Sequence, residues 1–412
     1  MTANRNYQWL LIGVLSMHFG VVFFDRNAFS FLTPFIQPDM KLTLTQIGLI
    51  GAGFSAAWAV AGLVMGSLSD RFGRRKAILI VATLVFALSS VLSGLAPTFV
   101  LLLGARMLMG VAEGGIMPIT QTLIAAEVAP ERRGLAQGIT QNFGANLLAN
   151  SLGPIIVVWM ATHYGWRQAF YLVAIPGFVM ALVIALCVRE PQQPKDRPKP
   201  TFADSVKLLQ DPAILVCVGL SILLVAYFVV WSNFMPLFLT QSKGFDPGAM
   251  SGIMSAMGFS SIAIAFIVPG LSDRLGRKPV AIVAGMLGAV MPLGALLIES
   301  TSPTPYYVVF AIGAAVTGVF PMAMATIPSE IVPPSLTATA LSLTMGISEV
   351  IGGVVGPPVA GKMGDAFGLG AAMWVLAGVS IGVAVVALLL RETAPLVLAR
   401  RAQARATATS AA

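Results

Sequence analysis

The residues of this chain with the clearest chemical potential are ionisable side chains that interrupt long apolar runs. Asp25 and Arg26 lie within the first apolar run, and Arg106 and Glu113 lie within a later one. A charged side chain at the depth of a bilayer costs at least ~2.5–3.5 kcal/mol on insertion scales unless it is paired or hydrated. These four residues are therefore candidates for binding a charged ligand or carrying a proton. The alternative is two self-neutralising ion pairs that only hold helices together.

The spacing of Arg106 and Glu113 predicts that both face one cavity. Seven residues are two turns of an α-helix, or about 10 Å along its axis, so the two side chains share almost one face. Gly110 and Gly114 lie on the same run and would let a neighbouring helix approach closely. Glu349 is a fifth ionisable residue in an apolar run. It is predicted either as a further proton or substrate site or as a protonated structural glutamate.

The composition indicates a membrane protein and argues against an enzyme. The chain is 57% hydrophobic and only 10% charged, which leaves too little polar surface to cover a soluble globule of 412 residues. The two cysteines imply neither a disulfide framework nor a metal site. The sequence contains no histidine/glutamate metal motif, no nucleophile elbow and no phosphate-binding loop. We therefore expect no catalysis and no cofactor, and we expect an ion gradient to supply the energy.

A half-length repeat organises the chain. The sequence GSLSDRFGRRK around Asp70 returns as GLSDRLGRK around Asp273, 203 residues later. The same offset superposes Asn146 on Glu349, and a Gly-Pro pair in the first half on one in the second. Parallel repeats of this size, separated by long apolar runs, are typical of secondary transporters.

Twelve apolar runs are long enough to cross a membrane, since a span needs roughly 20 residues. The predicted spans are 8–36, 45–69, 77–96, 98–124, 134–161, 166–188, 211–240, 247–272, 279–298, 305–328, 336–361 and 367–390. The predicted domains are an N-terminal six-helix bundle (1–190), a proline-rich cytoplasmic linker (191–210), a C-terminal six-helix bundle (211–392) and a cytoplasmic tail (393–412). The predicted fold class is an all-α membrane protein with two bundles related by a pseudo-two-fold axis.

The distribution of lysine and arginine predicts the orientation. Nineteen of these residues fall in the termini and loops of one side and 4 on the other, and the remaining two are Arg26 and Arg106. The positive-inside rule makes the richer side cytoplasmic. We therefore expect a multi-pass protein of the cell (inner) membrane with both termini in the cytoplasm. The net charge of +8 then reflects topology, and no nucleic-acid partner is expected.

The repeated loop resembles the signature of the major facilitator superfamily, and this resemblance covers nearly the whole chain. The loop lies between spans two and three and again between spans eight and nine. An aspartate at the end of a span can face arginines of its own loop, an arrangement able to latch one conformation and release in another. The alternative is a plain topology anchor. The candidate gating residues are Asp70, Arg71, Arg74, Asp273, Arg274 and Arg277.

Spans one and four resemble those of the anion:cation symporter family within this superfamily. The shared features are the Asp-Arg pair of span one and an Arg-x-x-x-Gly-x-x-Glu pattern in span four. The resemblance implies that Arg26 binds a substrate carboxylate and that Asp25 and Glu113 carry coupling protons. It also implies that Arg106 holds Glu113 ionised until it is displaced. The family pattern does not require Glu349, whose predicted role in proton coupling depends on its place in an apolar span.

The second half is expected to shape the cavity rather than to bind ions. The positions 203 residues after the four charged residues of the first half are all apolar. Tyr227 and Trp231 of span seven share one helical face and are predicted to contact the non-carboxylate part of the substrate. The amides predicted to line the same cavity from span five are Gln141, Asn142 and Asn146.

Together these features predict a proton-coupled symporter that imports a small organic anion, such as a sugar acid or another carboxylate, by alternating access. Its partners would be the anion, protons and the lipid bilayer, and it would act as a monomer. The second candidate is a proton-coupled antiporter that exports amphipathic drugs or metabolites, in which Glu113 and Glu349 would meet cations. A Gly-Pro pair on span five, here at 153–154, is associated with antiporters.

Overall fold

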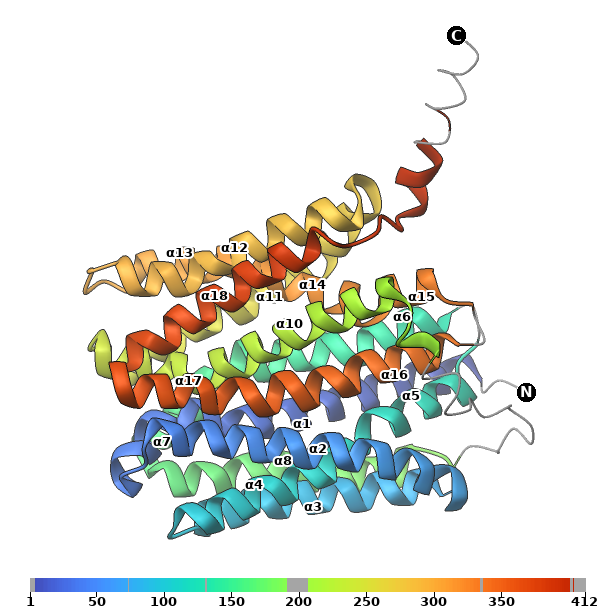
Figure 1. Cartoon of the computed structure of the whole chain (residues 1–412). Helices are drawn as coiled ribbons and strands as arrows, with labels where there is room; N and C mark the ends of the chain where they lie inside the picture. Colours follow the sequence, from blue (N-terminus) through green and yellow to red (C-terminus); the bar gives the residue numbers. More distant parts are fainter. Residues whose placement is uncertain are drawn as a thin grey trace, which may run out of the picture.

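Long apolar helices that run side by side make up this structure, a computed structural model (Figure 1). It describes residues 4–72, 74–129, 132–190, 207–333, 336–400 and 403. Within this described chain, twelve helical spans are long and apolar enough to cross a membrane. The predicted number of spans and the all-α fold class are therefore confirmed. Most of the predicted linker and tail lies outside the described residues.

The first six spans form the N-terminal bundle, most of which lies in the lower part of Figure 1. Spans four and five are each divided into several helical segments, whereas the others are single helices. The segments are α1 (Arg5–Met40), α2 (Leu44–Phe72), α3 (Arg75–Leu95), α4 (Phe99–Gly114), α5 (Ile116–Glu127), α6 (Arg133–Gly138), η2 (Ile139–Phe143), η3 (Ala145–Leu152), α7 (Gly153–Tyr164) and α8 (Trp166–Cys187).

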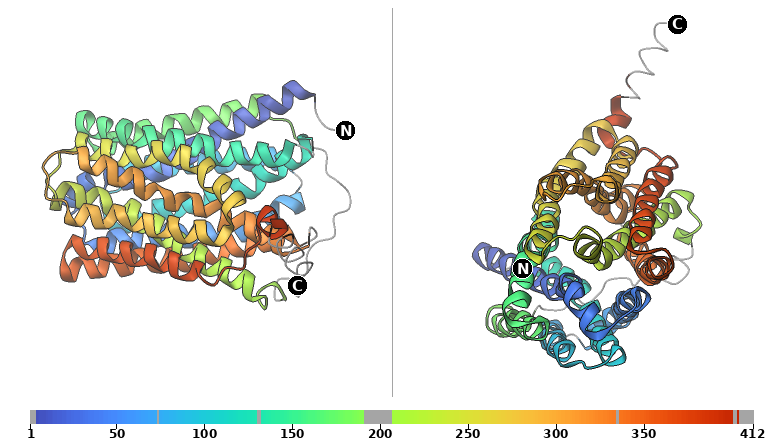
Figure 2. Two further views of the ribbon diagram at one scale, coloured as in Figure 1. Left: turned by 90° about the horizontal axis from the view of Figure 1, so that it is seen from above. Right: turned by 90° about the vertical axis from the view of Figure 1, so that its left-hand side faces the viewer.

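The last six spans form the C-terminal bundle, in which spans ten and eleven are divided like their repeat partners, and span seven ends in a separate π-helical segment. The segments are α10 (Pro212–Leu237), η4 (Phe238–Ser242), α11 (Pro247–Leu275), α12 (Arg277–Leu297), α13 (Thr304–Gly313), η5 (Ala314–Gly318), α14 (Val319–Pro321), η6 (Met322–Thr326), α15 (Ile327–Ile331), α16 (Thr337–Ser348), η7 (Glu349–Gly353), α17 (Val354–Phe367) and α18 (Leu369–Ala387). Viewed along the helices, the two bundles lie next to each other (Figure 2).

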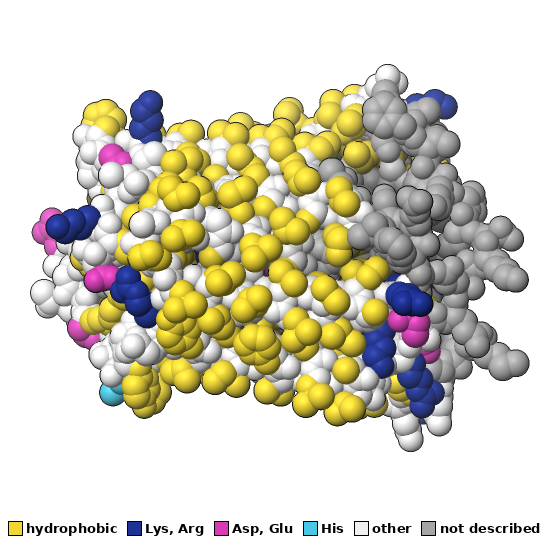
Figure 3. Space-filling view, turned by 90° about the horizontal axis from the view of Figure 1, so that it is seen from below, with side chains coloured by type: hydrophobic (Ala, Val, Ile, Leu, Met, Phe, Trp, Pro, Cys, Tyr) yellow, Lys and Arg dark blue, Asp and Glu magenta, His cyan; other side chains and the backbone are white. Residues whose placement is uncertain are grey.

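The surface has the polarity of a protein that sits in a bilayer. Apolar side chains cover the middle of the face in Figure 3, and charged side chains gather at its two ends. Large apolar side chains such as Phe266 and Leu186 are more than 70% exposed. Exposure of this kind would be unfavourable in water, but it is expected against lipid tails.

Spans five and eleven depart from regular α-helix at equivalent places. The π-helical segment η3 ends just before the Gly153-Pro154 pair, and the π-helical segment η7 ends three residues before Gly356-Pro357. Proline has no backbone N–H to donate to the preceding turn, so the hydrogen-bond pattern around it is rearranged. Asn146 lies in η3 and Glu349 lies in η7, which puts the two repeat-related polar residues where the backbone is irregular.

The two bundles touch most closely towards the end of the molecule opposite the chain termini. A Cβ atom at Gly48 of α2 would lie 2.4 Å from the carbonyl oxygen of Pro357 in α17, and one at Gly258 of α11 would lie 2.0 Å from that of Asn150 in η3. Only glycine permits such approach of one backbone to another. The close contact therefore depends on small residues in both bundles.

Candidate functional site: a charged cavity between the bundles

A cavity lies between the bundles and is bounded by α1, α2, α4 and α10. Its wall combines two arginines with small polar and aromatic side chains. The lining residues are Arg26, Asn27, Phe29, Ser30, Ile50, Gly51, Phe54, Ser55, Arg106, Phe228, Val229, Ser232 and Asn233. The predicted residues Arg26 and Arg106 therefore belong to one site.

The guanidinium of Arg26 pairs with a carboxylate of the opposite bundle. Its Nη2 lies 3.3 Å from Oε1 of Glu349, and the Oγ of Ser55 donates to the same oxygen at 2.9 Å. The guanidinium also lies over the Phe54 ring, 4.5 Å from its centroid, so that a cation–π contact supports the arginine from α2. The prediction that Glu349 is buried is confirmed, and its pairing with Arg26 is a feature that sequence reasoning missed.

Arg106 reaches across to α1 rather than along its own helix. Its Nη2 donates to the carbonyl oxygen of Arg26 at 2.6 Å, and its guanidinium lies 5.3 Å from the centroid of the Phe29 ring. No ion pair joins it to Glu113 among the described residues. The expectation that Arg106 pairs with Glu113 is therefore wrong for this conformation, because two helical turns separate them further than an ion pair extends.

Glu113 is buried at the contact between α4 and α2, and it is absent from the cavity wall. Its Oε1 has no hydrogen-bond partner. A Cβ atom at Gly110 would lie 2.5 Å from the carbonyl oxygen of Phe54, and one at Gly114 would lie 2.4 Å from that of Trp58. The predicted close approach of a neighbouring helix to these glycines is confirmed, and the shared cavity of Arg106 and Glu113 is not found.

Asp25 points away from its neighbour Arg26. Successive residues of an α-helix project about 100° apart, so the two side chains serve different surroundings. The Oδ1 of Asp25 accepts a 2.6 Å hydrogen bond from Ser90 of α3, and its Oδ2 has no partner. The carboxyl is fully buried inside the N-terminal bundle. It can hold a proton there without touching a ligand in the cavity.

A chain of amides connects the cavity to η3. Asn27 in the cavity wall donates to Asn150 at 3.0 Å, and Asn150 donates to Asn146 at 3.1 Å. The predicted amide Asn146 is thus linked to the site only through these two side chains. Gln141 is absent from the cavity wall, and the side chain of Asn142 lies outside the described residues.

The face of α10 that meets the cavity differs from the predicted one. The hydroxyl of Tyr227 donates to the carbonyl oxygen of Gly288 at 2.9 Å, within the C-terminal bundle. Trp231 is buried against Phe228 with its indole nitrogen unpartnered, and it does not line the cavity. The expected role of Tyr227 and Trp231 in lining the cavity is therefore wrong for this conformation. The residues that α10 presents instead are Phe228, Val229, Ser232 and Asn233.

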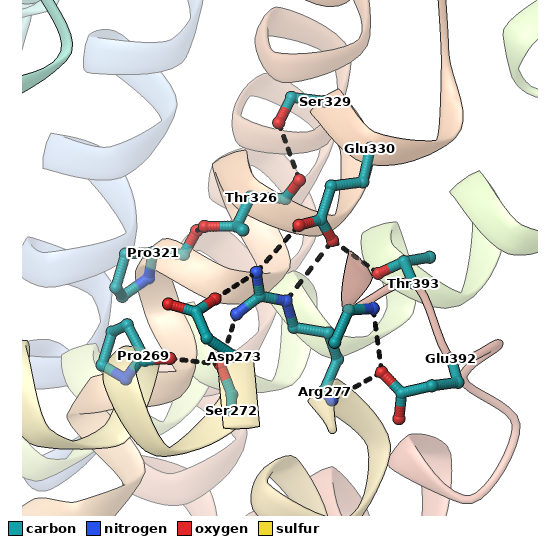
Figure 4. A network of polar contacts seen from close by, with 11 residues as sticks. Pro269, Ser272, Asp273, Arg277, Pro321, Thr326, Ser329, Glu330, Glu392 and Thr393 are labelled. Carbon is teal, nitrogen blue, oxygen red and sulfur yellow. Dashed lines mark hydrogen bonds and ion pairs between the residues drawn. The ribbon is translucent and has the colours of Figure 1, made fainter. Parts of the chain in front are cut away.

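A polar network occupies the second copy of the repeated loop (Figure 4). Arg277, the first residue of α12, pairs with Asp273 at 2.6 Å and with Glu330 at 2.8 Å, and its backbone N–H donates to Glu392. The predicted contact between Asp273 and an arginine of its own loop is confirmed. Arg274 is exposed. All partners belong to the C-terminal bundle, so the network closes within one bundle.

The first copy of the loop is offset by one residue. Arg75 begins α3, is buried, and donates its backbone N–H to Glu190 at 2.6 Å, as Arg277 does to Glu392. The predicted gating residue Arg74 is exposed. Arg75, and not Arg74, occupies the position in the first loop that Arg277 occupies in the second. The side chains of Asp70 and Arg71 lie outside the described residues.

Comparison with solved structures supports this architecture. A bacterial homolog of the human lysosomal transporter Spinster, solved in an inward-facing and unoccupied conformation, matches with a TM-score of 0.75. The match covers 94% of this chain and 96% of that one at 19% sequence identity. At this identity the likeness concerns the fold.

Curated relatives carry the names of transporters. The chain is 27% identical to a probable 4-methylmuconolactone transporter of Cupriavidus pinatubonensis over 338 residues, which is 80% of this chain and 78% of the relative. It is 30% identical to the hexuronate transporter of Bacillus subtilis over 63% of this chain and 64% of the relative. It is 25% identical to the multidrug resistance protein MdtL of Salmonella heidelberg over 87% of this chain and 88% of the relative.

The sequence profile of one family spans most of the chain. It matches residues 15–350, which include both copies of the repeated loop and every charged residue of the cavity. Together with the twelve spans and the two bundles, this match identifies the chain as a member of the Major Facilitator Superfamily of membrane transporters.

Proposed function

We propose that this protein is a proton-coupled symporter that imports a small organic anion, a sugar acid or another carboxylate, by alternating access. The observation that carries the proposal is Arg26, a guanidinium in the wall of the central cavity that already binds a carboxylate there. The names of the methylmuconolactone and hexuronate transporters support a small organic substrate. The protein would work as a monomer in the cell membrane with both termini in the cytoplasm.

The cavity wall offers complementary groups for the rest of such a substrate. Asn27 and Ser30 from α1 and Asn233 from α10 provide amide and hydroxyl groups that can bind substrate hydroxyls. Asn233 Nδ2 is buried near Gly51 and has no hydrogen-bond partner, so a substrate would satisfy this donor once the bundles move apart. Phe54 and Phe228 supply apolar surface on either side. Selectivity for one carboxylate substrate over another would then depend on these residues and not on Arg26.

Asp25 and Glu113 are the proposed proton sites. Each is buried, and each has a carboxyl oxygen without a hydrogen-bond partner. Proton binding removes a charge from a dry environment, where an uncompensated charge is unfavourable. Because Asp25 contacts α3 and Glu113 is buried outside the cavity wall, protons would act on helix packing rather than on the ligand directly. Coupling would then pass through α1 and α4, which also carry the two arginines.

Bundle contacts support assignment of this conformation to the inward-facing state. They gather at the end opposite the termini, where Gln241 of the C-terminal bundle donates to Gln37 of α1 at 2.9 Å and Asp365 binds the start of α2. If the termini are cytoplasmic, this closed end is the outer one. Rocking of the bundles would break these contacts and expose Arg26 to the outside.

Proteoliposomes containing a pH-sensitive dye would test the proposal. External addition of hexuronates, aromatic acids and dicarboxylates in separate pools should acidify the interior with one pool, and Arg26→Ala should abolish the signal. Glu113→Gln should retain exchange of anion but lose uphill accumulation, because one proton site is removed. Accumulation by Glu113→Gln equal to that of the wild type would refute the role of Glu113.

A second candidate function is export of amphipathic compounds in exchange for protons. The similarity to MdtL over 87% of the chain favours it. In this case Glu349 and Glu113 would meet cationic substrates. No acidification by any acid, with lipophilic cations instead dissipating a preset acid-inside gradient, would replace the symport proposal by this one.

A further inference from the structure

An ion pair joins the two bundles beside the cavity: Arg26 and Ser55, which both contact Glu349, line the cavity, whereas Glu349 itself does not. Arg26 belongs to α1, whereas Glu349 belongs to η7 on the other side of the interface. The remaining ion pairs found between described residues lie within one bundle or the other. Glu349 therefore brings a carboxylate from the C-terminal bundle to the arginine proposed to anchor the substrate.

The geometry of this pair is that of a replaceable contact. One Nη2–Oε1 distance of 3.3 Å joins the two groups, so the arginine lacks the second parallel hydrogen bond of a strong bidentate pair. The side chains are 13% and 11% exposed, so the pair is mostly buried, and Arg26 reaches the cavity wall. Another carboxylate can approach the remaining N–H groups of Arg26 from the cavity side.

The surroundings of Glu349 are shaped to hold its carboxylate at this point. A Cβ atom at Gly353 would lie 2.6 Å from Ser55 Oγ and 3.2 Å from Glu349 Oε1, so any larger residue would crowd their hydrogen bond. Ser55 donates to Glu349 from α2. A π-helical turn, which is often found at functional sites, carries the glutamate. Three separate features thus present this carboxylate to Arg26.

We propose that Glu349 is a built-in competitor of the transported anion, a carboxylate that occupies the substrate's place on Arg26 until the substrate displaces it. The proposal rests on the proposed function in that Arg26 is the anion anchor. In the empty transporter Glu349 neutralises a mostly buried guanidinium that would otherwise have no carboxylate partner. A ligand that bears a carboxylate or a sulfonate can take over this contact, and a neutral analogue cannot. Glu349 thereby favours anionic ligands and lowers their apparent affinity.

Acetate is a probe of this competition that does not require the true substrate to be known. The purified full-length protein would be heated in detergent with sodium acetate or with sodium chloride at equal ionic strength. Glu349→Ala vacates the contact on Arg26, so acetate should raise its melting temperature by on the order of 1–3 °C relative to chloride. The wild type should respond less than the variant, because acetate must first displace the Glu349 carboxylate from Arg26.

Two controls make the result specific. The double variant Arg26→Ala/Glu349→Ala should lose the response to acetate, since the anchor is absent. Ser55→Ala keeps both charges and removes only the hydroxyl that binds Glu349, so it should behave as the wild type or respond weakly. If Glu349→Ala does not fold, Glu349→Gln serves instead, since it keeps the shape of the side chain and removes its charge. It should then bind acetate about tenfold more tightly than the wild type.

Two outcomes would overturn the proposal. Equal responses of the wild type and the folded Glu349 variants would mean that Glu349 does not occupy the site. A folded Glu349 variant without any response would mean that Arg26 accepts no free carboxylate. The first outcome leaves the symport proposal intact, whereas the second also removes the carboxylate anchor on which that proposal rests. Proton coupling is tested separately by the proteoliposome assay.

Discussion

Asp365 forms a contact between the bundles that is suited to quantitative testing. Its carboxylate, on α17, accepts hydrogen bonds from the backbone N–H groups of Leu44 and Thr45 at 2.8 and 2.9 Å, and from the Thr45 hydroxyl at 2.5 Å. Leu44 and Thr45 begin α2, where backbone N–H groups have no partner within the helix and the helix dipole favours an anion. A residue of one bundle therefore caps a helix of the other. We predict that Asp365→Ala shifts the protein towards conformations in which this end is open.

The size of the shift follows from the contacts. Loss of a helix N-cap costs about 0.5–2 kcal/mol. Two of the three hydrogen bonds are exposed to solvent, so water replaces part of what is lost and about 1–2 kcal/mol is the appropriate range for the whole contact. Because these bonds exist only while the bundles touch, their full free energy enters the equilibrium between closed and open states. The ratio of the two states should change by about 5–30-fold.

Spin-label distances across the closed end would measure this ratio. Labels at Pro97→Cys in the loop before α4 and Thr301→Cys in the loop before α13 report on the two bundles, after replacement of Cys187 and Cys217. Asp365→Ala should increase the population with long distances. Asp365→Asn keeps one acceptor oxygen and should have a smaller effect.

A matched control comes from a cap that stays within one bundle. Asp246 accepts a hydrogen bond from the backbone N–H of Ala249 in its own helix, α11, at 3.0 Å. Asp246→Ala should therefore lower thermal stability without changing the distance distribution. An unchanged distribution in Asp365→Ala, or an equal change in Asp246→Ala, would refute the reasoning.

Three further substitutions test other contacts of the structure. Gly258→Val should abolish transport by a protein that still folds, because its Cβ would lie 2.0 Å from the carbonyl oxygen of Asn150 in the other bundle. Gly378→Val is the control and should transport normally, since a Cβ at Gly378 would have no atom within 4 Å. Equal uptake by the two variants would contradict the close approach of the bundles. Glu330→Ala should destabilise the C-terminal bundle by about 1–3 kcal/mol in thermal unfolding, because the buried Arg277 loses one of its two carboxylate partners. A melting temperature equal to that of the wild type would count against the network. Tyr227→Phe should lower the free energy of unfolding by about 1 kcal/mol, because the hydrogen bond to Gly288 is lost, and it should leave ligand affinity unchanged. A large loss of affinity would mean that Tyr227 does contact the ligand.

The sequence was sufficient to predict the spans and the close packing of α4. Apolar runs of membrane length and a repeat at one offset identify twelve helices without knowledge of their contacts. Gly110 and Gly114 predict a close helix neighbour because four-residue spacing puts them on one face. Glu349 was also identified, since an ionisable residue in an apolar span is conspicuous by its cost. These features depend on local sequence or on the bilayer.

The rotation of α10 could not be predicted in the same way. This helix is apolar nearly all round and buried on most sides, so its sequence has no polar face to orient it. Tyr227 and Trp231 drew attention by their size, but their face packs inside the C-terminal bundle. Asn233 was the available signal, because an amide in an otherwise apolar stretch needs a polar environment. Its face is the one that meets the cavity.

The pairing of Arg26 with Glu349 follows from how the repeat is broken. The positions that correspond to Asp25 and Arg26 in the second half are Phe228 and Val229, whereas the polar position of span five is retained in span eleven. Asn146 accepts a hydrogen bond from Asn150, a residue of its own bundle.

Because α10 has no charged residue at the equivalent positions, Glu349 pairs instead with Arg26 across the interface. The second half thus has a polar residue at the position of Asn146 but no arginine at the position of Arg26, and the resulting ion pair joins the two bundles. In a symmetric repeat, each bundle would contain its own arginine–carboxylate pair, and no such pair would connect the two bundles. In this chain the asymmetry makes the state of Arg26 depend on the position of the C-terminal bundle, which is the dependence that a transporter needs between ligand binding and rocking.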